Sequence, residues 1–248
     1  MGFFAGYFSY LLWMLPALII SAIAQAKVSS AYNKNSKIQN SRGITGADAA
    51  RHVLMSNNVT GVNIVATAGK MTDHFDPRNN TIYLSEGVYG ATTIAAVGIA
   101  AHEAGHAVQH AQGYIPNKIR SILVPITNFG SRIGWILILI GFAFSGYYAY
   151  SYSSFDTESV TYQLGGVLLV LGIILYSTSL LFTLVTLPVE FNASKRALNT
   201  IKSTNLLTGE QYSGAKQTLT AAAMTYVASA LTALLQLLRV IMLAKRRR

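Results

Sequence analysis

Long apolar runs alternate with one mixed segment along the chain. The apolar runs have lengths close to the roughly 20 residues that a helix needs to cross a bilayer, and they occupy residues 3–24, 133–150, 163–187 and 219–243. The first run predicts an N-terminal transmembrane anchor, and the second and third predict a transmembrane hairpin. The sequence Ala24-Gln25-Ala26 would also suit the cleavage site of a signal peptide, but no basic residue precedes the apolar core, which favours the anchor.

The mixed segment predicts a small folded region outside the lipid. Gly46 begins a Gly-Ala-Asp sequence that suits a helix start, and β-forming residues at 61–66 and 81–85 predict two strands paired as a hairpin. Residues 91–112 are rich in Ala and contain no Pro, so we expect a helix there, closed by Gly113. The fold class is therefore a mainly α integral-membrane protein with a small α+β region.

Composition agrees with a membrane protein, because 52% of the residues are hydrophobic and only 11% are charged. Lys and Arg are absent between Arg132 and Lys195, which is a longer gap than soluble domains normally have. The formal charge of +10 comes from basic residues beside apolar runs, which suits anionic lipid headgroups and not nucleic acid. The chain has no Cys, so any metal must be held by His and carboxylate side chains.

The distribution of basic residues also predicts an orientation. Most Lys and Arg fall in residues 27–132 and 188–218, which the positive-inside rule places in the cytoplasm. The acidic residues Asp156 and Glu158 would then lie outside, as would the N-terminus. If the last apolar run crossed the bilayer, the basic residues at 245–248 would lie outside too, so we expect that run to pack into the bundle or lie at the interface.

The sequence His102-Glu103-Ala104-Gly105-His106 carries the candidate chemistry. On a helix, two His residues four apart lie about 40° apart around the axis and one turn along it, so both imidazoles can bind one zinc ion. Glu103 lies beside them and is placed to act as the general base toward a zinc-activated water. Two His and a Glu could also occur on an ordinary helix, but buried polar groups there would need partners.

A catalytic zinc site needs a third protein ligand, and several residues could supply it. His110 is about 12 Å along the helix from His102 and is out of register for sharing one ion. Asp156 and Glu158 are predicted to lie across the membrane, and Glu210 lies in a polar turn. Glu190 is favoured, since Pro188 suits the first turn of a helix that begins where the transmembrane hairpin returns to the catalytic side. His52 and His74 remain alternatives.

Four sequence segments resemble the bacterial YugP-like membrane zinc peptidases: TDHFDP at 72–77, IYLS at 82–85, AAHEAGHAVQHA at 100–111 and PVEFNAS at 188–194. The resemblance extends over most of the chain and implies a gluzincin-type site, in which a Glu on a second helix completes the metal centre, as in HtpX-like peptidases. Such relatives commonly carry Asp four residues after that Glu to support a zinc-bound His, whereas this chain has Ser194. Ser194 or Asn192 could provide that support here.

We therefore expect a multi-pass protein of the bacterial plasma membrane that is a zinc metalloendopeptidase. Its partners would be the lipid bilayer and a peptide or protein substrate that is membrane-associated or unfolded. His74 could stabilise the oxyanion of the reaction, and Tyr83 could face the cleft or merely pack. The expected divisions are the anchor, the catalytic region, the transmembrane hairpin, the helix with the third ligand and the apolar C-terminal helix, at residues 1–26, 27–132, 133–187, 188–218 and 219–248.

Two other classes of function are compatible with parts of this pattern. A zinc-binding scaffold or a metal transporter would bind the ion without hydrolysis, but a purely structural site has no need of an uncoordinated carboxylate such as Glu103 beside the metal. An intramembrane peptidase of the site-2 type would use a later Asp from a membrane segment, and the chain has no Asp after Asp156.

Overall fold

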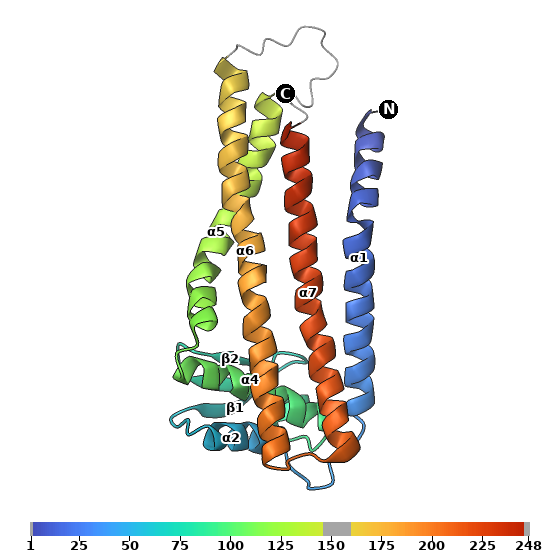
Figure 1. Ribbon diagram of the computed structural model, residues 1–248, viewed down its shortest axis with the longest axis vertical. Coiled ribbons are helices and arrows are strands. Elements are labelled where there is room, and N and C mark those ends of the chain that lie inside the picture. The colour runs from blue at the N-terminus through green and yellow to red at the C-terminus, as the bar shows by residue number, and fades with distance from the viewer. Residues whose placement is uncertain (1, 146–159, 246–248) are drawn as a thin grey trace. The chain divides into compact units, whose positions relative to one another are not determined.

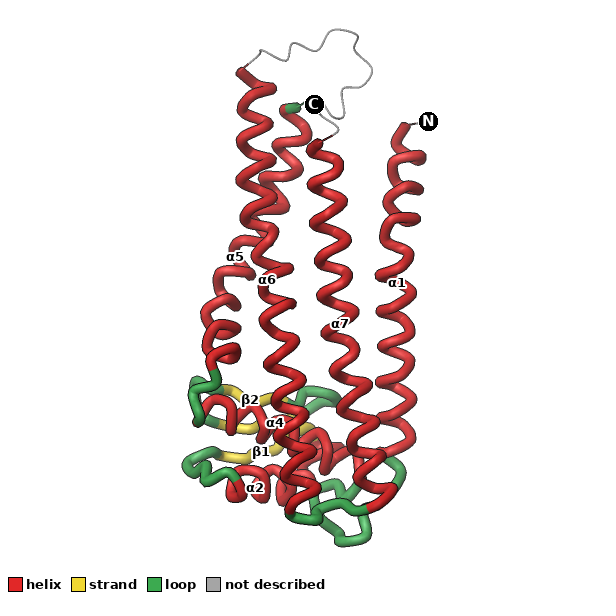
Figure 2. Tube along the Cα trace, in the orientation of Figure 1, coloured by secondary structure: helices red, strands yellow, loops and turns green. Residues whose placement is uncertain are grey.

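The structure is a computed structural model that describes residues 2–145 and 160–245, with side chains from residue 8 onward. Asp156, Glu158 and the last three Arg residues lie outside the described residues. Helices dominate, as Figures 1 and 2 show, and a three-stranded sheet is the only β-structure apart from one isolated bridge in the part described. The helices are α1 (Gly2–Asn35), α2 (Gly46–Ser56), α3 (Glu86–Tyr89), α4 (Ile94–Ala111), α5 (Ile115–Phe144), α6 (Val160–Ser203) and α7 (Gly209–Lys245).

Four helices, α1, α5, α6 and α7, are long and apolar enough to cross a membrane. The prediction of a mainly helical, multi-pass membrane protein is thereby confirmed. Helix α5 begins at Ile115, well before the apolar run predicted from residue 133. The predicted run left out this first part of the helix because it contains basic residues. The last apolar run belongs to one uninterrupted helix, α7, that is long enough to span.

The chain forms two compact units, and each long helix contributes to both. The first unit comprises residues 1–20, 119–185 and 228–248. Within it, α5 and α6 pack glycine against glycine: a Cβ added at Gly172 would lie 2.8 Å from the carbonyl oxygen of Gly134. Small residues let two helix backbones approach closely in a membrane, where packing drives helix association.

The second unit comprises residues 21–118 and 186–227, and it contains the sheet and the sequence 102–106. The sheet order is β1-β3-β2, with strands β1 (Asn63–Thr67), β2 (His74–Asp76) and β3 (Thr81–Ser85). Because β3 lies in the centre, four of its five residues are buried, whereas the edge strand β1 is mostly exposed.

The predicted hairpin between residues 61–66 and 81–85 is wrong, because β1 runs parallel to β3. The antiparallel partner of β3 is β2, joined to it by the turn at residues 77–80. The three residues of β2 are too few to show an alternating pattern, and they lie beside Pro77, so the sequence signal was that of a turn.

Two helix starts in this unit follow from local capping. The side chain of Thr45 accepts a hydrogen bond from the backbone N–H of Asp48, and Asp48 returns one, so α2 begins with a capping box at the predicted position. At the start of α4 the side chain of Thr93 accepts a hydrogen bond from the N–H of Ala96, and Gly113 closes the helix in the left-handed region, at φ 65°.

The expected helix start at Pro188 is wrong, because Pro188 lies inside α6. A proline inside a helix costs about 3 kcal/mol through a lost hydrogen bond and a steric clash. Here the helix continues with a stripe of fully buried side chains at four-residue spacing, which are Val189, Ala193, Ala197 and Ile201. Burial of this face outweighs the local preference for a break.

The glycine contact between α5 and α6 predicts the effect of a single methyl group. We expect Gly172→Ala to lower the stability of the folded protein by about 1–3 kcal/mol, because the added Cβ would meet backbone atoms that cannot rotate away. Thermal unfolding of the purified protein in detergent measures this change. The matched control is Ile174→Ala on the exposed face of the same helix, which should change stability by less than about 0.5 kcal/mol. Equal unfolding midpoints for Gly172→Ala and the parent would contradict the packing.

Candidate metal centre

Helix α4 carries His102 and His106 on one face, and their side chains converge. The two Nε2 atoms lie 3.1 Å apart, and the ring planes are nearly perpendicular, at 84°. Both rings are mostly buried, with side-chain exposures of 15% and 13%. The four-residue spacing therefore brings together the two nitrogen atoms that the sequence predicted.

Glu190 reaches the same point from α6. Its Oε2 atom lies 3.3 Å from Nε2 of His102 and 3.5 Å from Nε2 of His106, and its side chain is 2% exposed. Two imidazoles and one carboxylate form the usual ligand set of a catalytic zinc site, and the ligand atoms of a tetrahedral ion with bonds of about 2.0–2.1 Å lie roughly 3.3 Å apart. The observed separations match that spacing, so the three side chains could hold a zinc ion.

A glycine allows α4 to lie so close to α6. A Cβ added at Gly105 would lie 2.6 Å from the carbonyl oxygen of Ala193, which is closer than a real Cβ contact allows. Gly105 falls between the two histidines on α4, and Ala193 falls three residues after Glu190 on α6. The absence of a side chain at position 105 therefore lets the two sets of ligand atoms come within range of one another.

Hydrogen bonds on the far side of each ring set its orientation. Nδ1 of His102 lies 3.0 Å from the hydroxyl of Ser194, and Nδ1 of His106 lies 3.1 Å from Oε1 of Gln109. The Gln109 amide nitrogen donates to the carbonyl of Val189 and to Oδ1 of Asn192, which leaves its oxygen to accept from His106. With Nδ1 protonated in both rings, each Nε2 keeps its lone pair toward the centre.

Ser194 and Asn192, the two residues considered as support for a zinc-bound His, thus occupy different places. Ser194 contacts His102 directly, while Asn192 contacts the amide that holds His106. Sequence reasoning missed Gln109, although its position three residues after His106 on a helix was a usable signal.

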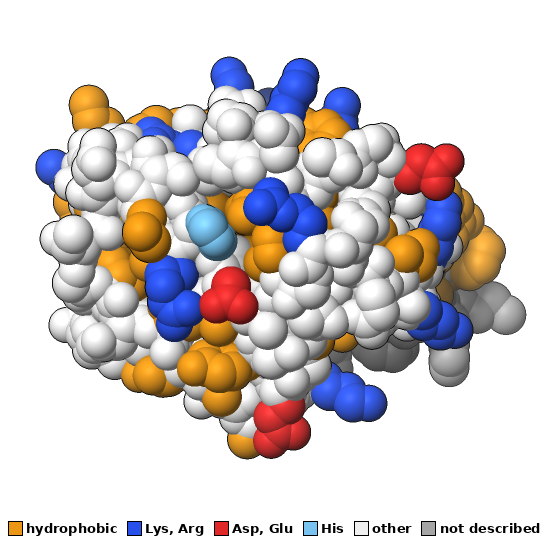
Figure 3. Space-filling view, turned by 90° about the horizontal axis from the view of Figure 1, so that it is seen from below, with side chains coloured by type: hydrophobic (Ala, Val, Ile, Leu, Met, Phe, Trp, Pro, Cys, Tyr) orange, Lys and Arg blue, Asp and Glu red, His pale blue; other side chains and the backbone are white. Residues whose placement is uncertain are grey.

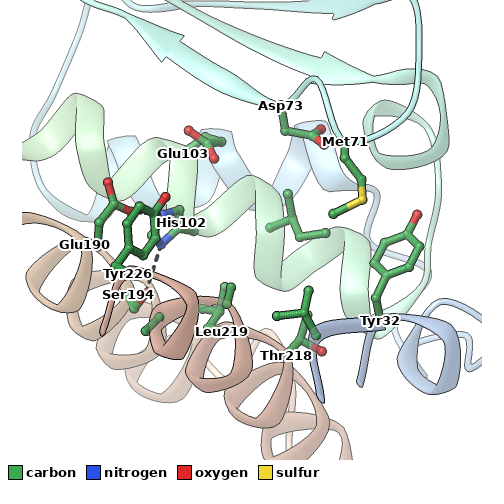
Figure 4. A pocket seen from close by; sticks show the side chains of 14 residues that line it. Tyr32, Met71, Asp73, His102, Glu103, Glu190, Ser194, Thr218, Leu219 and Tyr226 are labelled. Atoms are coloured by element: carbon green, nitrogen blue, oxygen red, sulfur yellow. Dashed lines mark hydrogen bonds and ion pairs between the residues drawn. The ribbon is translucent and has the colours of Figure 1, made fainter. Parts of the chain in front are cut away.

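Glu103 lies beside the three-residue group without belonging to it. It lines a cavity of about 180 Å³ together with His102 and Glu190, as Figure 4 shows. Burial raises the pKa of the Glu103 carboxyl to about 7, although the neighbouring His102 opposes that shift. A carboxyl group that titrates near neutral pH can both accept and release a proton.

The other histidines do not belong to this group. His74 begins β2, where its exposed ring stacks on Tyr83 with 4.8 Å between the ring centroids and its Nδ1 contacts the carbonyl of Thr72. His52 and His110 are exposed. Among the described residues, the structure groups only His102, His106 and Glu190 as possible metal ligands.

Two further residues line the cavity for which the sequence predicted no role. Asp73 comes from the segment before β2, and its carboxylate accepts hydrogen bonds from the backbone N–H and the hydroxyl of Ser85. Tyr226 comes from α7 and lines the same cavity as His102 and Glu190 (Figure 4). Asp73 lies in the segment at 72–77 noted above, but that segment assigned it no role, and only the fold brings the two residues to one cavity.

Comparisons with known proteins agree with this geometry. A protein-family model described as "Putative neutral zinc metallopeptidase" matches residues 10–245. The chain is 40% identical over 230 residues to a protein of Bacillus subtilis (strain 168) described as "Putative membrane protease YugP", covering 92% of this chain and 93% of that protein. No solved structure matches. Because the family model spans nearly the whole chain, the protein belongs to this family of neutral zinc metallopeptidases.

Proposed function

We propose that the protein hydrolyses peptide bonds of membrane-associated or unfolded proteins, with His102, His106 and Glu190 as zinc ligands and Glu103 as the general base. A bound zinc ion would supply Lewis-acid activation of a water molecule and of the substrate carbonyl. The observation that carries the proposal is the position of Glu103, which lines the same cavity as two of these residues but is not one of the metal-binding group. A purely structural zinc site has no need of such a carboxylate.

The residues around the cavity would have three separate roles: proton transfer, orientation of the imidazoles and charge compensation of the metal. Glu103 would accept the proton of the attacking water and later give it to the leaving amine, for which a pKa of about 7 suits both steps. Ser194 and Gln109 would hold the two imidazoles in the orientation in which Nε2 faces the centre. The largely buried Glu190 would bring the negative charge that a divalent cation requires.

The distribution of basic residues favours the cytoplasmic side of the membrane for the site. The second unit contains twelve of the nineteen Lys and Arg residues, and Figure 3 shows such side chains scattered over one face of the protein. Basic segments next to membrane spans remain in the cytoplasm more often than they cross.

The first test of this function is Glu103→Gln. The amide cannot accept a proton, so the rate of hydrolysis should fall by about 100- to 10,000-fold, while the three proposed ligands remain and zinc content stays at the parent level. Cleavage of an unfolded protein substrate and metal analysis of the same preparation measure both quantities. Glu210→Gln, on the exposed surface, is the matched control. Parent-like cleavage by Glu103→Gln would exclude Glu103 as the base, and loss of zinc would make it a ligand.

The second test concerns the third ligand. Glu190→Ala should raise the Kd for zinc by more than about 10- to 100-fold, because losing even an outer-sphere contact to a ligand has an effect of that size. Competition with a chromogenic chelator measures the Kd. Glu210→Ala should bind zinc as the parent does. If Glu190→Ala retains its zinc while His74→Ala or His52→Ala loses it, the third ligand is a histidine.

The third test concerns orientation. The chain has no Cys, so Thr60→Cys introduces a single thiol at an exposed position between α2 and β1. We expect a membrane-impermeant thiol reagent to label it in inverted membrane vesicles and to leave it unlabelled in intact cells. Labelling in intact cells would place the site outside.

A further inference from the structure

The cavity beside Glu103 has two chemically distinct parts. One part carries the polar groups of the candidate metal centre, and the rest is bordered mainly by apolar side chains of α1, α4 and α7 together with residue 71. In Figure 4, His102, Glu190, Ser194 and Tyr226 lie at one end, whereas Tyr32, Met71 and Thr218 lie at the other. The remaining lining residues include Val28, Ile99, Leu219, Ala222 and Ala223.

Helix periodicity explains how the apolar part forms. On α7 the lining residues recur as two pairs four apart, 218–219 and 222–223, followed by Tyr226, so they lie on one face. On α1, Val28 and Tyr32 are also four apart. On α4, Ile99 lies three residues before His102, one turn along the same helix.

We propose that this apolar part binds one branched aliphatic or aromatic side chain of the substrate, next to the bond that is cleaved. The inference rests on the proposed function, since it assigns a substrate preference to the same site. The whole cavity, with its polar part included, has a volume of about 180 Å³, and an apolar cavity of about 150 Å³ accommodates a benzene ring, so the apolar part has room for no more than one such side chain. Ala222 and Ala223 leave that space open on the α7 side.

Besides Glu103 and Glu190, one further carboxylate lines the cavity, and it is already hydrogen-bonded. Asp73 lines the cavity, but both oxygens of its carboxylate accept hydrogen bonds from Ser85. A carboxylate already satisfied by the backbone N–H and hydroxyl of one neighbour gains less from a substrate cation than one facing water. Met71 is 67% exposed at the cavity, and its flexible thioether can adapt to apolar groups of different shape.

Peptide binding tests the preference without requiring turnover. The probes are peptides identical except for one position, which carries Gly, Ala, Leu, Phe, Lys or Asp, and the protein is zinc-loaded Glu103→Gln in detergent. Leu and Phe peptides should bind at least about ten-fold more tightly than the Gly peptide, as expected for burying an apolar side chain. Equal affinities for all six, or tightest binding of the Lys peptide, would overturn the proposal.

Two substitutions in the same background should move the preference in opposite directions. Ala222→Leu fills the cavity and should reduce the Phe-to-Ala affinity ratio at least about ten-fold, whereas Ile99→Ala enlarges the cavity and should raise that ratio. Met224→Ala is the control, because Met224 is exposed on α7 and does not line the cavity. A ratio that neither Ala222→Leu nor Ile99→Ala changes would also overturn the proposal.

Cleavage and binding of these peptides distinguish the peptidase proposal from the apolar-site proposal. If the zinc-loaded parent cleaves none of these peptides but binds Leu and Phe peptides preferentially, the peptidase proposal fails and the apolar site stands. If the parent cleaves all of them at similar rates and without preference in binding, the apolar site fails and the peptidase proposal stands.

Discussion

The close contact between α4 and α6 at Gly105 is the constraint on which the site depends. The ligand atoms come from two helices that are far apart in sequence, and they meet only because the backbones approach at a position with no Cβ. Any larger residue there would force the two backbones to shift, because a Cβ at position 105 would lie 2.6 Å from the carbonyl oxygen of Ala193. Close-packed interiors transmit such a shift, because they contain few voids that could absorb it.

Burying the polar groups of this centre requires partners for each of them. Glu190 is almost completely enclosed, and two imidazole nitrogens lie within 3.5 Å of its carboxylate. The opposite ring nitrogens contact Ser194 and Gln109, so each histidine has a polar neighbour at both ends. Burial of polar side chains in an Ala-rich helix is tolerable only with such a network.

Local patterns predicted the parts of this fold that depend on neighbours within a few residues. The spans, α4 with its closing glycine and the convergence of His102 and His106 follow from apolar run length and helical periodicity. Strand pairing and helix continuation depend on tertiary contacts, which explains why the parallel pairing of β1 and the passage of α6 through Pro188 were not predicted. Glu190 was reached by elimination among few carboxylates, and its role as a ligand stays a prediction, as does that of Glu103.

The two histidine supports differ in how they tolerate sequence change. Gln109 is anchored to the backbone carbonyl of residue 189, which exists whatever side chain evolution places there. His102 depends instead on the side chain at position 194, which is Ser in this chain. An Asp would add a negative charge behind one imidazole only. Substitution at position 194 can thus adjust how strongly Nε2 of His102 donates electrons to a metal, without acting directly on Nε2 of His106.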